Sequence, residues 1–244
     1  MLVAMVQAHC YRWYMGRDST REKIITAGSR LLADGGREAV STRAVCAASG
    51  VQSPTLYRLF GDKNGLLDAI AAHVFESYLA DKAALPETGD PVDDLRRGWD
   101  LHVGFGVANP ACYSLIYGTD RPGAESPAAR RAAAELAKRI RRIAEAGRLR
   151  VGEEHAAHLV HAAGCGMTFT LISLPESERD PALSRAARES AIAAVTTDGP
   201  GTADTGPTGL AVALRALAPQ LTALTGAERA LLAEWMDRLA AAGR

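Results

Sequence analysis

Signals for helix initiation recur along the whole chain. A capping residue is followed directly by proline at Ser53-Pro54, Asp90-Pro91, Ser126-Pro127 and Asp180-Pro181. Such side chains accept hydrogen bonds from the free N–H groups of a first helical turn, and proline suits that turn because it has no N–H to leave unpaired. No stretch shows the alternating apolar pattern of strands on both sides of a hairpin turn. The sequence therefore predicts an all-α protein.

Two capping boxes mark further helix starts, Ser19 with Glu22 and Thr225 with Glu228. In such a box each side chain accepts a hydrogen bond from the backbone N–H of the other residue. Apolar residues at helical spacing follow both boxes, and the glycine pair at 35–36 is expected to end the first of these helices.

Composition excludes several classes of protein. With 48% hydrophobic and 23% charged residues among 244, the chain is typical of a globular protein, and no apolar run approaches the ~18 residues that span a bilayer. The 28 basic and 28 acidic residues balance, so affinity for nucleic acid must come from a local patch. The cysteines lie far apart, without zinc-type spacing. We therefore expect a cytoplasmic protein with no membrane partner, disulfide framework, metal or other cofactor.

The segment 41–60 predicts two short helices joined by a tight turn. Ser41 or Thr42 can cap the first helix, and Ser53 can cap the second. Gly50 permits the backbone to turn between them, and the valine that follows would fill the corner. This pattern is typical of a helix-turn-helix.

The second helix of this segment is expected to present a polar end to solvent. Leu56 and Phe60 would point inward, which leaves these residues exposed near its N-terminus: Gln52, Ser53, Thr55, Tyr57 and Arg58. Arg58 can offer a bidentate contact to guanine, while hydroxyl groups can hold phosphates. Eight basic and five acidic side chains lie between positions 17 and 65, a local positive excess. A helical hairpin that only packs is the alternative, but the coincidence of cap, turn and exposed helix favours DNA binding.

These residues resemble a known family. The run 50–60, with Asp62-Lys63 and Leu66-Leu67 after it, is similar to the signature of the tetracycline-repressor (TetR) family of bacterial transcription regulators, and the resemblance extends from Thr20 to Leu79. It implies DNA contacts, mostly to phosphates, from Thr42, Arg43, Ser53, Pro54, Thr55, Tyr57, Arg58 and Lys63. It also implies a homodimer that binds a palindromic operator.

The expected organisation follows from the resemblance and from two breaks in composition. Residues 1–16 form an N-terminal arm, 17–62 the three-helix DNA-binding domain, and 63–244 a helical-bundle domain for ligand binding and dimerisation. Within the last, 63–85 keeps helical spacing and predicts a connecting helix. The stretch 196–207, rich in Gly, Thr and Pro, predicts a mobile loop.

Aromatic and polar residues behind the connecting helix are candidates for an effector pocket. They are Trp99, His102, Phe105, Tyr113 and Tyr117. In the family, a ligand in this domain tilts the connecting helix and alters the separation of the recognition helices. We therefore expect a repressor whose operator affinity is lowered by a small apolar ligand. Plain core residues are the alternative for each position, and a regulator without an effector is the alternative function.

Three histidines at a spacing of three suggest a different class of protein. His155, His158 and His161 could serve a helical metal-dependent enzyme. On a helix, however, successive members advance by 300°, so the three side chains spiral around the axis. Histidines at the surface or at an interface are the preferred interpretation, and no catalysis is expected.

Small residues indicate where two copies of the chain would meet. The small residues Ala162, Ala163, Gly164 and Gly166 predict a close helix approach. We expect helices around 153–173 and 181–195 to form the dimer contact. The basic residues between 130 and 150, Arg139 among them, are expected on the solvated face of an amphipathic helix.

Overall fold

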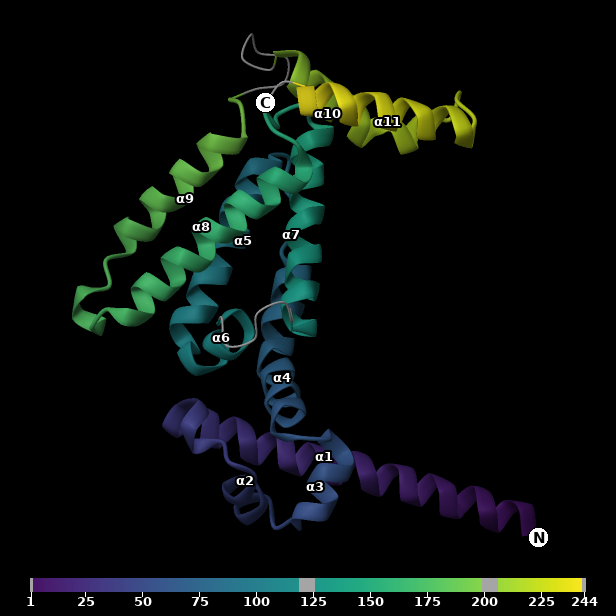
Figure 1. Cartoon of the computed structure of the whole chain (residues 1–244), viewed down its shortest axis with the longest axis vertical. Helices are drawn as coiled ribbons and strands as arrows, with labels where there is room; N and C mark the ends of the chain where they lie inside the picture. The colour runs from purple at the N-terminus through teal and green to yellow at the C-terminus, as the bar shows by residue number, and fades with distance from the viewer. Residues whose placement is uncertain (1, 119–125, 199–205, 243–244) are drawn as a thin grey trace. The chain divides into compact units, whose positions relative to one another are not determined.

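The structure is a computed structural model that describes residues 2–118, 126–198 and 206–242. Eleven α-helices cover most of the described chain (Figure 1). They are α1 (Leu2–Ala39), α2 (Thr42–Ser49), α3 (Ser53–Phe60), α4 (Lys63–Ala84), α5 (Pro91–Ala108), α6 (Pro110–Tyr117), α7 (Pro127–Glu145), α8 (Glu153–Ser173), α9 (Pro181–Val195), α10 (Gly206–Leu217) and α11 (Gly226–Ala242). Two short 3₁₀ turns are at Glu176–Glu178 and Ala218–Gln220. The predicted all-α class is confirmed.

Most of the predicted helix starts occur with the expected hydrogen bonds. Asp90 Oδ1 accepts from the Val92 N–H at 2.8 Å, and Asp180 Oδ1 accepts from the Ala182 N–H at 2.8 Å. Ser126 Oγ likewise accepts a first-turn hydrogen bond, at 3.0 Å. The second capping box is reciprocal, because Thr225 donates to Glu228 Oε2 at 2.8 Å and the Glu228 N–H donates back at 3.3 Å.

The prediction that Ser19 and Glu22 form a capping box at a helix start is wrong. α1 begins at Leu2 and runs through residues 2–16, which the sequence assigns to an N-terminal arm. Ser19 therefore lies inside a helix, where no first-turn N–H is free to donate to its hydroxyl. The glycine pair does break the helix as predicted. Gly35 and Gly36 have non-helical backbone angles, with φ of 66° at Gly36.

The chain divides into two compact units. Unit 1 comprises Met1–Tyr78 with Asn109–Ala129, and unit 2 comprises Leu79–Ala108 with Arg130–Arg244. α4 therefore contributes to both units, and α6 belongs to unit 1 with the DNA-binding segment. The sequence-based division at position 62 had assigned all of α4 and α6 to the second domain.

Unit 1 has an apolar core, and α6 packs within it. Val45 of α2, Leu56 of α3 and Ile70 of α4 are fully buried. The Tyr113 ring of α6 is also fully buried, and the Cys112 thiol of the same helix lies 3.8 Å from the Ala71 carbonyl oxygen of α4. These contacts explain why α6 joins unit 1.

Unit 2 contains apolar and charged residues in its interior. Its apolar core includes Trp99 of α5, Ile140 of α7, Val160 of α8 and Ile192 of α9. α8 packs against both α5 and α9, and α9 runs beside α8 (Figure 1). Among the described helices of the chain, none combines the length and apolar character needed to cross a membrane.

The basic run of α7 departs from the prediction. Arg139 is only 8% exposed and does not lie on a solvated face. Arg142 contacts the fully buried carboxylate of Asp94 on α5, and Arg148 Nη1 donates to Asp90 Oδ1 at 2.7 Å. Periodicity could not reveal this, because the partners come from another helix.

The first two residues of the stretch expected as a mobile loop are buried and bonded to the backbone of another segment. Thr196 and Thr197 are buried, and Leu149 forms an isolated β-bridge with Thr196. The Thr197 N–H donates to the Arg148 carbonyl oxygen at 2.9 Å. The prediction is therefore wrong for these two residues; positions 199–205 lie outside the described residues, and α10 begins at Gly206.

Candidate nucleic-acid interface

The turn between α2 and α3 has the predicted geometry. Ser41 has an extended backbone, and its Oγ accepts from the Ala44 N–H at 3.1 Å, which caps α2. α2 ends at Gly50, whose φ of 69° and ψ of 20° lie in the left-handed region that favours glycine. The Gly50 N–H donates to the Cys46 carbonyl oxygen and closes the helix end.

The start of α3 differs from the prediction by one residue. The Gln52 carbonyl oxygen accepts from the Thr55 N–H at 3.0 Å, which makes Gln52 the capping position. Ser53 is then the first residue of the helix, so its predicted role as the cap is wrong. Among the described residues, no side chain caps α3. The Ser53 hydroxyl lies 3.7 Å from the Cys46 thiol of α2.

The N-terminal half of α3 is buried on one side and exposed to solvent on the other. Leu56 is fully buried, whereas the predicted contact residues Gln52, Ser53, Pro54, Tyr57 and Arg58 are exposed. The Tyr57 side chain is 48% exposed despite its aromatic ring. Thr55 is half-buried. Phe60, expected inside, is also half-buried, and the Arg21 guanidinium of α1 lies 5.5 Å from its ring centroid.

The remaining predicted DNA contacts lie at the first residues of α2 and α4. Thr42 is half-buried and Arg43 is exposed at the start of α2, and Lys63 is exposed as the first residue of α4. Asp62 caps α4, because its Oδ1 accepts from the Gly65 N–H at 2.8 Å. Sequence reasoning missed this cap, although an aspartate directly before a run with helical spacing could have indicated it.

Close packing in unit 1 positions these elements. A Cβ added at Gly28 of α1 would lie 2.3 Å from Ile70 Cδ1 of α4. A Cβ added at Gly65 would lie 2.1 Å from the Phe60 carbonyl oxygen, so the turn from α3 into α4 requires glycine there. The exposed polar end of α3 is thus carried by a tightly packed scaffold, which is the arrangement that major-groove recognition requires.

The five predicted pocket residues divide between the two units. In unit 2, Trp99 is buried, with its indole N–H donating to Ser184 Oγ of α9 at 3.1 Å, and His102 is also buried. Phe105 is half-buried on α5. In unit 1 the ring centroids of Tyr113 and Tyr117 lie 4.7 Å apart.

Two hollows in the described structure are lined by residues other than the five predicted pocket residues. One, of about 510 Å³, lies between α1 and α2 in unit 1. The other, of about 680 Å³, lies in unit 2 between the start of α8 and the pair α10 and α11, and includes His155 and His158. None of the five predicted pocket residues lines either hollow.

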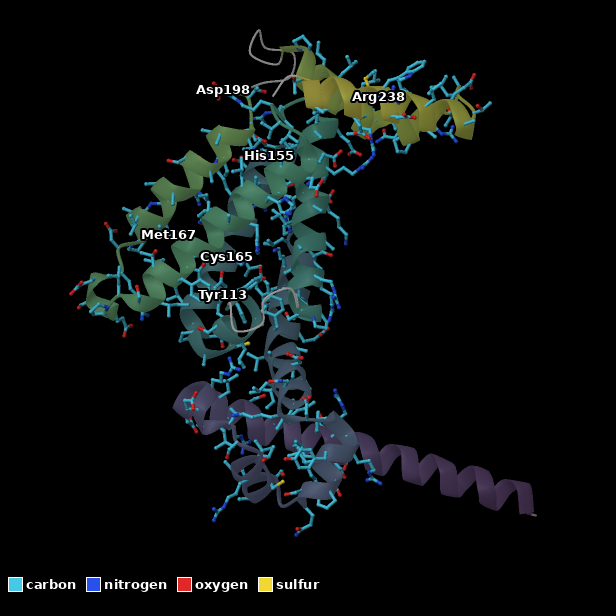
Figure 2. All side chains as sticks on the ribbon, viewed as in Figure 1. Tyr113, His155, Cys165, Met167, Asp198 and Arg238 are labelled. Carbon is cyan, nitrogen blue, oxygen red and sulfur yellow. The ribbon has the colours of Figure 1, made fainter. Side chains whose placement is uncertain are left out.

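The three histidines of α8 separate as expected. His155 and His158 are exposed, whereas His161 Nε2 lies 3.6 Å from the Cys165 thiol on the same helix. Figure 2 shows His155 and Cys165 at different positions along α8. Across the described residues, no three His, Cys, Asp or Glu side chains are grouped so that they could hold a metal ion. The alternative of a metal-dependent enzyme therefore gains no support from this helix.

Exposed faces run along both helices predicted for dimerisation. On α8 one exposed face has residues that recur at helical spacing, and they include His155, Leu159, Ala162, Gly166, Thr170 and Ser173. On α9 they include Ala182, Leu183, Ala186, Ser190 and Ala193. Apart from its chain neighbours and the backbone of its own helix, no described atom lies within 4 Å of a Cβ added at Gly166. Gly164 is different, because a Cβ there would lie 3.5 Å from His102 Cδ2, so its predicted place at the dimer contact is wrong.

Comparison with known proteins gives a specific match to the segment that carries this interface. Residues 24–70 match the family described as bacterial regulatory proteins, tetR family. HTH-type transcriptional regulators of Mycobacterium tuberculosis and Mycobacterium bovis are 31% identical over 119 residues. That region is 46% of this chain and 49% of theirs, so the chain spans about half the length of the curated relatives it matches.

Solved structures are similar over more of the chain. A tetR family transcription regulator from Shewanella sp. PV-4 has a TM-score of 0.58 at 20% identity, and the match covers 73% of this chain and 98% of that one. A TetR transcription regulator from Haloarcula marismortui has a TM-score of 0.57 at 17% identity, with 74% and 100% covered. At these identities the likeness shows the fold.

Proposed function

We propose that this chain is a sequence-specific DNA-binding transcriptional regulator, because its residues 24–70 match the family described as bacterial regulatory proteins, tetR family. It acts in the cytoplasm as a homodimeric repressor, without catalysis. The observation that carries the proposal is the exposed polar end of α3, held by the buried Leu56 behind a glycine turn with φ of 69°.

Within this interface the residues have different roles. Arg58 reads a base, because its exposed guanidinium can form two hydrogen bonds with the guanine edge. Arg43, Tyr57 and Lys63 are exposed around it and hold phosphates, together with the hydroxyls of Thr42, Ser53 and Thr55. Gln52 and Pro54 complete the contact surface.

A dimer supplies the second half of the contact. One eight-residue recognition helix buries too little surface for tight specific binding, so two copies related by a two-fold axis bind a palindromic operator. The exposed small residues of α8 and α9 suit this contact, because they allow two helix pairs to approach closely.

A small ligand relieves repression. It binds in unit 2 beside Trp99 and His102 and favours the state that binds DNA poorly. DNA must weaken ligand binding by the same factor, since the coupling between two sites is reciprocal.

The test is selection of duplexes from a random library by the purified protein, followed by sequencing. The proposal expects enrichment of a palindrome whose half-sites lie about one helical turn apart. Recovery of unenriched sequences, with retention that depends only on salt, would show that the protein does not read sequence.

A further inference from the structure

Cys165, near the middle of α8, lies beside two imidazoles in unit 2 (Figure 2). Its Sγ is 3.6 Å from Nε2 and 3.8 Å from Nδ1 of His161, which precedes it by about one helical turn. The same sulfur lies 4.0 Å from Nε2 of His102 on α5. The thiol can therefore share a hydrogen bond with either ring.

Lys82 places a buried positive charge near this thiol. It belongs to α4 and is 5% exposed, and its Nζ donates to the Ala132 carbonyl oxygen of α7 at 3.4 Å. Burial and the Arg139 charge lower the pKa of Lys82 to about 8, while the charges of Glu135 and Cys165 oppose this shift. Lys82 is thus mainly protonated at neutral pH. Because its attraction to a Cys165 thiolate is mutual, Lys82 favours the thiolate over the thiol.

The two imidazoles differ in their ability to accept the thiol proton. His102 is 9% exposed, and burial with the charges of Lys82 and His161 lowers its pKa to about 3, so it stays neutral near neutral pH. His161 is half-buried and lies closer to the sulfur. His161 is therefore the acceptor, and the imidazolium that forms places a second positive charge beside the thiolate.

The exposure of Cys165 also distinguishes it from other described cysteines. It is half-buried, and reactive cysteines typically combine positive surroundings with partial exposure. Cys112 of unit 1 is 3% exposed, and burial raises its pKa to about 12. Cys46 is half-buried, but its sulfur lies 3.7 Å from the Ser53 hydroxyl, which is a much weaker base than an imidazole. Of these three thiols, Cys165 has the surroundings of a nucleophile.

We propose that Cys165 is a site of covalent modification by α,β-unsaturated carbonyl compounds, with His161 as the acceptor of its proton. The thiolate sulfur attacks the β-carbon and forms a C–S bond, while the electron pair of the C=C bond moves to the α-carbon. The proton held by His161 then neutralises the α-carbon. The product is a saturated thioether, no group leaves, and no oxidant is consumed.

Addition of carbon is preferred to disulfide chemistry because unit 2 has a single cysteine. Cys10, Cys46 and Cys112 all fall in the residue ranges of unit 1. A disulfide cannot form within unit 2, and a sulfenic acid on Cys165 would find no second thiol there to resolve it. An addition reaction requires one thiol and a neighbouring base, which is what Cys165 and His161 provide.

The site also names a ligand class for the effector proposed above, and this part rests on the proposed function. That effector is placed beside Trp99 and His102, and the Cys165 sulfur lies 4.0 Å from His102 Nε2. An adduct on Cys165 would therefore occupy the same part of unit 2. The reactivity of the thiol does not depend on DNA binding, so the two parts can fail separately.

The alternative is that Cys165 forms a structural hydrogen bond and reacts no faster than an ordinary thiol. The probe is methyl vinyl ketone, and 2-butanone, which lacks the C=C bond, is its unreactive counterpart. The full chain is treated at pH 7 after removal of reductant, and the adduct at each cysteine is followed by mass spectrometry of its peptides. This measurement uses the unmodified protein, so it does not depend on whether any variant folds.

Cys165 is expected to react about tenfold or more faster than Cys46 and Cys112. The reason is that an ordinary thiol is deprotonated in only a few per cent of molecules at pH 7, and Cys112 is buried besides. Equal rates at Cys165 and Cys46, or no adduct at Cys165, would overturn the proposal.

His161→Gln and His158→Gln form a matched pair of variants on α8. His158 is exposed and lies about two turns before Cys165. At pH 7 the rate at Cys165 is expected to fall about tenfold in His161→Gln and to stay unchanged in His158→Gln. At alkaline pH, where a thiol ionises without a neighbouring base, His161→Gln should approach the wild-type rate. A wild-type pH profile in folded His161→Gln would contradict the role of His161.

Several charged or titratable groups contribute to this pH profile. Those that act directly on Cys165 are Lys82 from α4, His102 from α5 and His161 from α8, while Arg139 and Glu135 from α7 act on Lys82. Lys82 loses its proton as pH rises through about 8, so its support for the thiolate is present at pH 7 and fades above pH 8. The comparison between the two histidine variants is therefore made at pH 7.

Binding to the selected duplex tests the part that rests on the proposed function. Methyl vinyl ketone should weaken operator binding by the wild type and by Cys46→Ser about tenfold or more. It should cause no such loss in Cys165→Ser, and 2-butanone should cause none in any of the three. An adduct at Cys165 without loss of operator binding overturns the effector class alone. Absence of sequence-specific DNA binding in the untreated wild type overturns the regulator, while the reaction at Cys165 is still measured.

Discussion

Units 1 and 2 differ in whether they bury charged side chains. The buried polar and charged side chains of the described chain are Lys82, Asp94, His102, Arg139, Thr168, Thr196 and Thr197, and all of them belong to unit 2. In unit 1 none of the described basic residues is buried, and Arg43, Arg58 and Lys63 are exposed around an apolar core.

This difference has a physical consequence for each unit. A DNA-binding surface needs cations in solvent, where they can exchange salt counterions for phosphates. In the interior of unit 2 the loss of one charge has a larger effect, because electrostatic interactions strengthen as the local dielectric falls. Unit 2 should therefore be more sensitive than unit 1 to the loss of a single charge and to pH.

The largest expected effect concerns the open face of α8. Gly166→Arg should yield a folded monomer whose affinity for the selected operator falls by about a hundredfold or more, because one protomer contacts only one half-site. The variant should fold, since a Cβ at Gly166 meets no atom within 4 Å. Light scattering and operator titration check both points.

Gly104→Arg is the control for this substitution. Gly104 is also an exposed helical glycine of unit 2 with no atom near an added Cβ, but it lies on α5. This variant should remain a dimer. A dimeric Gly166→Arg that still binds the operator would exclude this face of α8 as the contact.

Next in size is the loss of a buried charge from unit 2. Asp94→Asn should lower the free energy of unfolding by about 3 kcal/mol, because Arg97 and Arg142 would face a neutral partner in the interior. Urea denaturation at fixed protein concentration measures it. The neighbouring Asp93→Asn should cost less than about 1 kcal/mol, since the Asp93 side chain is 57% exposed where it pairs with Arg96. Equal losses of unfolding free energy in the two variants would contradict the larger contribution expected of the buried carboxylate.

The buried imidazole of unit 2 predicts a specific acid sensitivity. Burial lowers the pKa of His102 from 6.5 to about 3. Between these two pH values the unfolded chain binds a proton at His102 more readily than the folded chain does. The contribution of neutral His102 to stability is therefore complete above pH 6.5 and is lost as pH falls toward 3. The loss is at most about 1.4 kcal/mol per pH unit.

His102→Gln should therefore flatten the dependence of unfolding free energy on pH below 6.5. His73→Gln, which alters an exposed histidine of unit 1, should leave the wild-type slope unchanged. If both variants keep the wild-type slope, His102 is not buried in its neutral form.

The smallest effect is expected in unit 1. Lys63→Ala should weaken binding to every duplex alike and reduce the slope of log affinity against log salt by about 1, because one fewer counterion is released. Fluorescence anisotropy over a range of salt concentrations measures the slope. Lys138→Ala in unit 2 should leave it unchanged, and an unchanged slope for Lys63→Ala as well would remove Lys63 from the interface.

Local patterns predicted unit 1 better than unit 2, for a physical reason. The cap at Ser41 and the left-handed Gly50 depend on neighbours within a few residues, so the sequence contains the information. The burial of Arg139 depends on carbonyl oxygens of residues 45 and 57 positions away, which no helical periodicity reports. Gly164 and Gly166 look alike in sequence, and only packing against His102 distinguishes the inner glycine from the exposed one.

Within the interface, the errors concern positions rather than the motif. Ser53 was expected to cap α3, but the Gln52 carbonyl oxygen begins the helix one residue earlier. The Ser19 box was overridden because α1 continues back to Leu2. Helix ends are the least certain part of a sequence-based assignment, since several side chains within one turn can satisfy the same N–H groups.

The most direct test of the central claim is whether α3 reads base sequence. The affinities of wild type and Arg58→Ala are measured for the selected operator and for a scrambled duplex of equal composition at one salt concentration. The wild type should prefer the operator by a factor of roughly 10³ or more, and Arg58→Ala should lose about 1–3 kcal/mol on the operator and little on the scrambled duplex. Equal affinity of the wild type for both duplexes, or an equal loss on both for Arg58→Ala, would contradict the account.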